Sequence, residues 1–102
     1  MNGILVVGGG IAGLALARAL RRHGLPVELV ERDPGAGAGG LAINLPGNAV
    51  AAFAELGLGE RLAGLGRPVG RREYRADSGR LLFGVDEIAF WGAADQPRCV
   101  LR

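Results

Sequence analysis

The sequence predicts an α/β fold built on a parallel strand–helix–strand unit, and three observations near the amino terminus support this class. Residues 3–7, Gly-Ile-Leu-Val-Val, form an apolar run rich in β-branched residues, typical of a strand buried on both faces of a parallel sheet. Residues 11–23 then carry apolar side chains at helical spacing, and residues 27–31 alternate between apolar and acidic side chains. A strand, a helix and a strand within about 30 residues form a βαβ unit, which is nearly always right-handed.

The end of the first helix has its own signals. Arg21 and Arg22 stand in the last turn, where the helix dipole favours cations. Gly24 is expected to end the helix, and Pro26 prevents its continuation. His23, the single histidine, is expected to cap the last carbonyl groups.

The rest of the chain predicts short elements separated by glycine. Residues 33–40 are rich in glycine and are expected to form a mobile loop, and residues 86–97 are expected to be irregular. The regular elements expected between them are a helix over 47–56, a helix over 60–65 and a hairpin over 70–85 that turns at 77–79.

Composition excludes several classes of protein. The chain has 102 residues and a mass of 10.5 kDa, which allows one small domain. Its 19 glycines have no three-residue period, and 49% of its residues are hydrophobic, so a collagen, a linker or a disordered chain is excluded. The net charge of +2 gives no large field to attract nucleic acid or a membrane surface.

The chain offers few groups for catalysis, metal binding or disulfide formation. Cys99 is the single cysteine, so no internal disulfide can form, and a reducing cytoplasmic location is the simplest interpretation. With one histidine and no metal-ligand spacing, we expect no metal site and no catalytic side chain. Residues 1–17 lack charge, but glycines interrupt them and they fall short of the about 20 apolar residues of a membrane span.

A glycine-rich turn joins the first predicted strand to the first helix. Residues 8–13, Gly-Gly-Gly-Ile-Ala-Gly, fit the pattern G-x-G-x-x-G in the strand-to-helix context that the pattern requires. Gly8 permits the tight turn, Gly10 lets the backbone approach a pyrophosphate, and Gly13 lets the helix pack on the strand. The turn therefore predicts a dinucleotide-binding, Rossmann-like unit.

Two further features place a ligand at this turn. Ile11 and Ala12 bring free N–H groups to the helix start, where the dipole also favours an anion. Glu31 follows Gly13 by 18 residues, close to the about 20 expected of an acid that binds the ribose hydroxyls. Because a carboxylate there repels a 2′-phosphate, the site favours FAD or NAD over NADP.

Several landmarks beyond the turn carry a family resemblance. They are the Glu-Arg pair at 31–32, Asn48-Ala49 at the start of a predicted helix, Leu-Gly-Leu at 56–58, the turn at 77–79, and Arg98 with Leu101. Together they resemble the single-component FAD monooxygenases with the para-hydroxybenzoate hydroxylase fold. Asn48 equally suits the N-cap of its helix. In the family, Arg-x-x-Leu begins the next flavin-side helix.

The resemblance implies a cofactor, a reductant and a set of binding residues. It implies FAD reduced by NAD(P)H, and O₂ with a small organic substrate, aromatic or polyketide-like. The binding residues it implies are Gly8, Gly10, Ile11, Ala12 and Gly13 around the pyrophosphate, Glu31 on the ribose, Arg32 along the adenosine, and Arg98 at the phosphate or ribityl portion.

The resemblance also implies a domain division. We expect residues 1–66 to be part of the FAD-binding domain, 67–97 a hairpin entering a β-rich substrate domain, and 98–102 the start of a helix returning to the FAD domain. The family's second FAD-binding motif is missing, so we expect a segment of a longer protein, or a remnant, that is inactive alone. The alternatives are another FAD oxidoreductase, of the amine oxidase or geranylgeranyl reductase type, and a non-catalytic dinucleotide-binding module.

Overall fold

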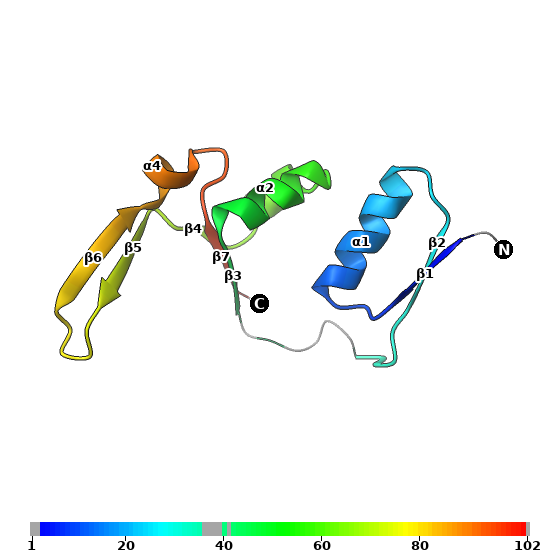
Figure 1. Ribbon diagram of the computed structural model, residues 1–102, viewed down its shortest axis with the longest axis horizontal. Coiled ribbons are helices and arrows are strands. Elements are labelled where there is room, and N and C mark those ends of the chain that lie inside the picture. The colour runs from blue at the N-terminus through cyan, green and yellow to red at the C-terminus, as the bar shows by residue number, and fades with distance from the viewer. Residues whose placement is uncertain (1–2, 36–39, 41, 102) are drawn as a thin grey trace. The chain divides into compact units, whose positions relative to one another are not determined.

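The computed structural model describes residues 3–35, 40 and 42–101. The chain divides into two compact units, residues 1–40 and residues 41–102. The first unit contains β1 (Ile4–Val7), α1 (Ile11–Arg22) and β2 (Val27–Val30), shown in blue to cyan in Figure 1.

The first unit is the predicted strand–helix–strand arrangement. β1 and β2 pair in parallel, with Ile4 opposite Val27 and Val7 opposite Val30. Helix α1 packs against both strands. The α/β class predicted from the apolar run, the helical spacing and the second strand is therefore confirmed.

The end of α1 follows its glycine signal. Gly24 has a φ of +73°, a left-handed conformation that costs glycine little. The N–H of Leu25 donates to the carbonyl of Leu20, and the N–H of Gly24 donates to that of Arg21, both at 3.0 Å. These two bonds form a Schellman motif. His23 is the C-cap residue and donates its backbone N–H to the carbonyls of Ala19 and Leu20.

The burial of β1 differs from the prediction. Val6 is buried, whereas Leu5 and Val7 are 57% and 78% exposed. The prediction of a strand buried on both faces is therefore wrong for the described chain. The physical reason is that, within the described residues of the first unit, β1 belongs to a sheet of two strands on which α1 packs.

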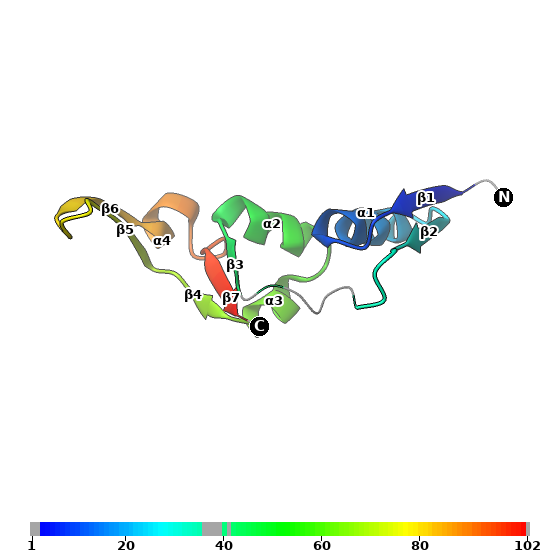
Figure 2. The ribbon, with the colours of Figure 1, turned by 90° about the horizontal axis from the view of Figure 1, so that it is seen from below.

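The second unit is built from short elements around two sheets. They are β3 (Ala42–Leu45), α2 (Gly47–Glu55), α3 (Gly59–Ala63), β4 (Arg67–Pro68), β5 (Arg71–Arg75), β6 (Leu81–Asp86), α4 (Glu87–Trp91) and β7 (Arg98–Leu101). β3, β7 and β4 form an antiparallel sheet with β7 in the centre, and Figure 2 shows β4 and β7 side by side. Leu45, Val50 and Leu62 form the core beneath α2 and α3.

The predicted hairpin is confirmed. β5 and β6 pair antiparallel, with Arg72 opposite Val85 and Tyr74 opposite Phe83. The rings of Tyr74 and Phe83 stack with centroids 4.4 Å apart. Gly79 sits in the turn with a φ of +87°, as the Asp-Ser-Gly signal at 77–79 indicates.

Two predictions for the carboxyl-terminal third are wrong. The segment Arg98–Leu101 forms β7 instead of the start of a helix, because its backbone pairs with both β3 and β4. Residues 86–97 are not irregular throughout, because Glu87–Trp91 form α4. The Asp86 side chain caps this helix by accepting from the N–H groups of Ile88 and Ala89.

Two other predictions lie outside what the structure tests. Residues 36–39 of the predicted glycine loop fall outside the described residues. The expected domain boundary at residue 66 stays a prediction, since the compact units divide at residue 40.

Candidate functional site

The glycine-rich turn between β1 and α1 is held at the carboxyl end of the parallel strands. The N–H of Gly8 donates to the carbonyl of Val30 at 2.8 Å, which ties the turn to the end of β2. Gly8 has a φ of +108°, a conformation that strongly favours glycine. The N–H of Leu14 then donates to the carbonyl of Gly10, so the helix begins directly after the third glycine.

The space available for a side chain differs between Gly13 and Gly10. A Cβ at Gly13 would overlap the carbonyl oxygen of Gly8 and lie 3.4 Å from Cγ1 of Val6. A Cβ at Gly10 would meet nothing within 4 Å. Gly13 therefore serves the packing of α1 on the turn, whereas Gly10 leaves its backbone open to a ligand.

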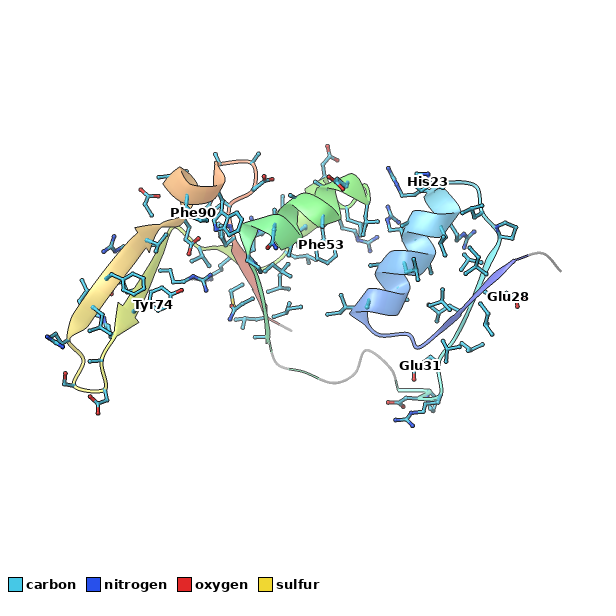
Figure 3. All side chains as sticks on the ribbon, viewed as in Figure 1. His23, Glu28, Glu31, Phe53, Tyr74 and Phe90 are labelled. Carbon is cyan, nitrogen blue, oxygen red and sulfur yellow. The ribbon has the colours of Figure 1, made fainter. Side chains whose placement is uncertain are left out.

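The carboxylate of Glu31 lies against the same turn (Figure 3). Its Oε2 accepts from the N–H of Gly9 at 2.6 Å, and its Oε1 accepts from the N–H of Asp33 at 2.9 Å. These backbone hydrogen bonds, the one from Asp33 first, hold the pKa of Glu31 below its ordinary value. The lowered pKa leaves the carboxylate ionised at neutral pH, and the exposed side chain is accessible to hydroxyl donors.

The start of α1 is open to an anion. Gly10 is the N-cap residue, no side chain caps the helix, and the first turn holds no acidic residue. Ile11 and Ala12 are both exposed. With 12 residues, α1 has a dipole that favours negative charge at this end. The open face at Gly10, the backbone N–H groups of Ile11 and Ala12 and the Glu31 carboxylate match the chemistry of an adenosine diphosphate moiety.

The two predicted arginines have different surroundings. Arg32 is exposed and directly follows Glu31. Arg98 lies in the second unit, where its Nε donates to the carbonyl of Leu65 at 3.0 Å and its Nη2 to that of Ala63 at 2.9 Å. Arg98 therefore satisfies carbonyls at the end of α3, and its contact with a cofactor stays a prediction.

Three other features concern the thiol, the possible metal ligands and the helices of the described residues. Cys99 is half-buried in β7 as a free thiol. Within the described ranges, no group of three or more His, Cys, Asp or Glu side chains could hold a metal ion. None of the helices in the part of the chain described is both long and apolar enough to cross a membrane.

One buried charged residue, Glu87, is not among the residues predicted from the sequence. Glu87 is 3% exposed and begins α4, in a segment expected to be irregular. The Asp86 N-cap followed by an acidic residue was the signal that could have found this helix.

The chain is similar to known FAD-dependent proteins. Residues 3–67 match the family model described as FAD dependent oxidoreductase. The chain is 49% identical over 61 residues to 3-hydroxybenzoate 6-hydroxylase of Polaromonas naphthalenivorans, which is 60% of this chain and 15% of that protein. It is 47% identical over 58 residues to salicylate hydroxylase of Pseudomonas putida, 56% of this chain and 13% of that protein.

Solved structures show the same similarity over the whole chain. HpxO of Klebsiella pneumoniae, complexed with FAD and uric acid, is 29% identical with a TM-score of 0.75, covering 98% of this chain and 25% of that one. The p-nitrophenol 4-monooxygenase PnpA of Pseudomonas putida DLL-E4 is 24% identical with a TM-score of 0.85, covering 99% of this chain and 26% of that one. The chain thus spans about a quarter of the length of these structures.

Proposed function

The chain belongs to the family of FAD-dependent oxidoreductases, and on this premise we propose that it is the FAD-binding amino-terminal part of a flavin-dependent monooxygenase. The observation that carries the proposal is the geometry of the glycine turn. Gly10 is open, Gly13 is tightly packed, and the Glu31 carboxylate lies on the turn. The hydroxylases and monooxygenases among its relatives support the class of enzyme.

The residues of the first unit would divide the binding of FAD between them. The backbone of Gly8, Gly10 and Gly13 and the N–H groups of Ile11 and Ala12 would hold the pyrophosphate at the positive end of α1. Glu31, ionised at neutral pH, would accept hydrogen bonds from the adenosine ribose. Arg32 would lie along the adenosine side, where its exposed guanidinium can contact the ligand.

The redox chemistry would come from the cofactor. Bound FAD supplies the electron transfer and oxygen chemistry of such enzymes, and the protein binds, orients and shields it. We propose NAD(P)H as the reductant, O₂ as the oxidant and a small organic molecule, aromatic or polyketide-like, as the substrate. The relatives named for 3-hydroxybenzoate and salicylate support an aromatic substrate.

Two further proposals rest on single features. The Glu31 carboxylate would disfavour a 2′-phosphate by charge repulsion, so the ribose site would select FAD over NADP. A cytoplasmic location is supported by the presence of one cysteine in the sequence.

Purification followed by spectroscopy tests the proposed function. We expect the protein purified from cells to carry a flavin absorbance band, or to regain it when FAD is added. NAD(P)H oxidation should then rise when a suitable aromatic substrate is supplied. A folded protein that neither retains nor rebinds FAD would contradict the proposal, and FAD binding without substrate-dependent oxidation would support the non-catalytic alternative instead.

A further inference from the structure

The glycine-rich turn contains one glycine to which the sequence pattern assigns no role. In G-x-G-x-x-G the residue between the first two glycines is free to vary, and here it is Gly9. The backbone of Gly9 lies outside the left-handed region, whereas Gly8 has a φ of +108°. The backbone conformation therefore does not call for glycine at residue 9, so the space around this residue becomes the relevant property.

The space beside Gly9 is filled by the side chain of Glu31, which Figure 3 labels. A Cβ at residue 9 would lie 3.1 Å from Cβ of Glu31 and 3.3 Å from both its Cγ and its Oε2. Carbon atoms in ordinary contact are about 3.5–4.0 Å apart, so these separations are tight. The three nearest atoms all belong to Glu31, so a side chain at residue 9 would first displace this carboxylate.

Two backbone groups hold the Glu31 carboxylate in that space. The N–H of Gly9 donates to its Oε2 at 2.6 Å, and the N–H of Asp33 donates to its Oε1 at 2.9 Å. The Asp33 side chain in turn accepts from the N–H of Gly35 at 2.8 Å, which fixes the segment that carries the second donor. An ionised carboxylate has about four acceptor sites, so about two stay open on Glu31. Two open sites on a fixed, exposed carboxylate suit two neighbouring hydroxyl groups.

We propose that Gly9 is a positioning residue for ribose recognition, because its missing side chain lets the Glu31 carboxylate sit on the turn with acceptor sites free for the ribose hydroxyls. The identity of the ligand as a ribose rests on the proposed function. The N–H of Gly9 is engaged by Glu31, whereas the N–H groups of Ile11 and Ala12 are assigned to the pyrophosphate. A larger residue 9 should therefore weaken recognition of the ribose and leave recognition of the diphosphate intact.

Two nucleotide probes test the proposal on the purified protein and on its Gly9→Val variant. The probes are ADP and 2′,3′-dideoxy-ADP, which lacks both ribose hydroxyls, and their dissociation constants are measured by titration calorimetry. We expect the original protein to bind ADP at least about tenfold more tightly, because hydrogen bonds to a charged acceptor are lost with the hydroxyls. In Gly9→Val this ratio should fall below about threefold, while the affinity for 2′,3′-dideoxy-ADP stays unchanged.

Titration of the Glu31 carboxyl group, followed by carbon NMR, reports its placement without any nucleotide. In the original protein the backbone bonds from Asp33 and then Gly9 lower the pKa of Glu31. Both N–H groups remain in Gly9→Val, so a pKa raised toward the ordinary 4.5 would show that the carboxylate has left the turn and not that a donor is missing. A merely structural role of Gly9 would change the urea midpoint and leave this pKa unchanged.

Two further variants are matched to Gly9→Val. Gly70→Val makes the same change in the second unit, where a Cβ would have Nε2 of Gln96 as its nearest atom outside the chain neighbours, at 3.9 Å. It should leave the nucleotide ratio and the pKa of Glu31 as in the original protein. Gly9→Ala requires Glu31 to shift by only a few tenths of an ångström, so both of its values should lie between those of the original and of Gly9→Val.

Three results would overturn the proposal. They are an original protein that binds both nucleotides equally, a Gly9→Val protein that keeps the full preference for ADP, and a Gly9→Val protein whose Glu31 pKa is unchanged. Should Gly9→Val fail to fold, Gly9→Ala decides by the same two measurements, and values equal to the original count against the proposal. An original protein that binds neither ADP nor FAD counts against the proposed function, and the pKa of Glu31 then still decides whether Gly9 places the carboxylate.

Discussion

Replacing Gly13 by alanine should destabilise the first unit through one methyl group. A Cβ at this position would overlap the carbonyl oxygen of Gly8 and lie 3.0 Å from its carbonyl carbon. The obstacle is backbone and not a flexible side-chain end, and the same turn is tied to β2 by the bond from Gly8 to Val30. The helix and the turn would therefore have to move apart.

The size of the effect follows from two opposing contributions. Overpacking a fixed site costs typically about 1–3 kcal/mol, and a backbone obstacle places this case in the upper part of that range. Alanine is a better helix former than glycine by about 1 kcal/mol, which offsets part of the loss. We expect Gly13→Ala to lower the free energy of unfolding by about 2 kcal/mol, measured by urea denaturation followed by circular dichroism.

Gly10→Ala is the matched control for this experiment. Its Cβ would meet nothing within 4 Å, and the backbone angles of Gly10, φ −74° and ψ −175°, are open to alanine. We expect its free energy of unfolding to change by less than about 0.5 kcal/mol, while FAD affinity falls because the methyl group occupies the open face. A Gly13→Ala protein as stable as the original would refute the account of the turn.

Three further predictions concern Glu31, Arg98 and Asp86. The pKa of Glu31 lies below its ordinary value of 4.5, so its bond to the Gly9 N–H should hold at neutral pH and weaken only as the pH falls through that lowered pKa. The NMR shift of the Gly9 amide should follow this titration, and Glu31→Gln should abolish it. Arg98→Met should cost about 1–3 kcal/mol in urea denaturation, because two carbonyls lose their donors; a loss under about 0.5 kcal/mol would contradict this. Asp86→Ala should cost about 1 kcal/mol by removing the cap of α4, whereas Asp86→Asn should retain most of the stability.

The first unit could be predicted because its signals are local. The apolar run of β1, the helical spacing of α1 and the glycine at residue 24 each act on their own neighbours in the sequence. The roles expected of Gly8 and Gly13 in the turn agree with the φ of the first and the close packing of the second. The bond from Gly9 to Glu31 joins residues 22 apart and needed the structure.

The second unit was predicted less well because long-range pairing decides it. β3 and β4 are too short to show a pattern, and each exists by pairing with β7. The segment Arg98–Leu101 was expected to start a helix because of its resemblance to Arg-x-x-Leu, but backbone pairing to two strands outweighs that signal. A cavity is lined by Arg72 and Tyr74 of the hairpin and by Glu87 of α4, and no spacing in the sequence reveals it.

Competition for the glycine turn tests the central claim most directly. The claim is that the first unit binds the adenosine diphosphate part of FAD through Gly10, the start of α1 and Glu31. In a titration of the purified protein with FAD, we expect one FAD bound per chain, displaced by ADP and much less by ADP carrying a 2′-phosphate. FAD binding that ADP does not displace, or that Gly10→Ala leaves unchanged, would contradict the claim.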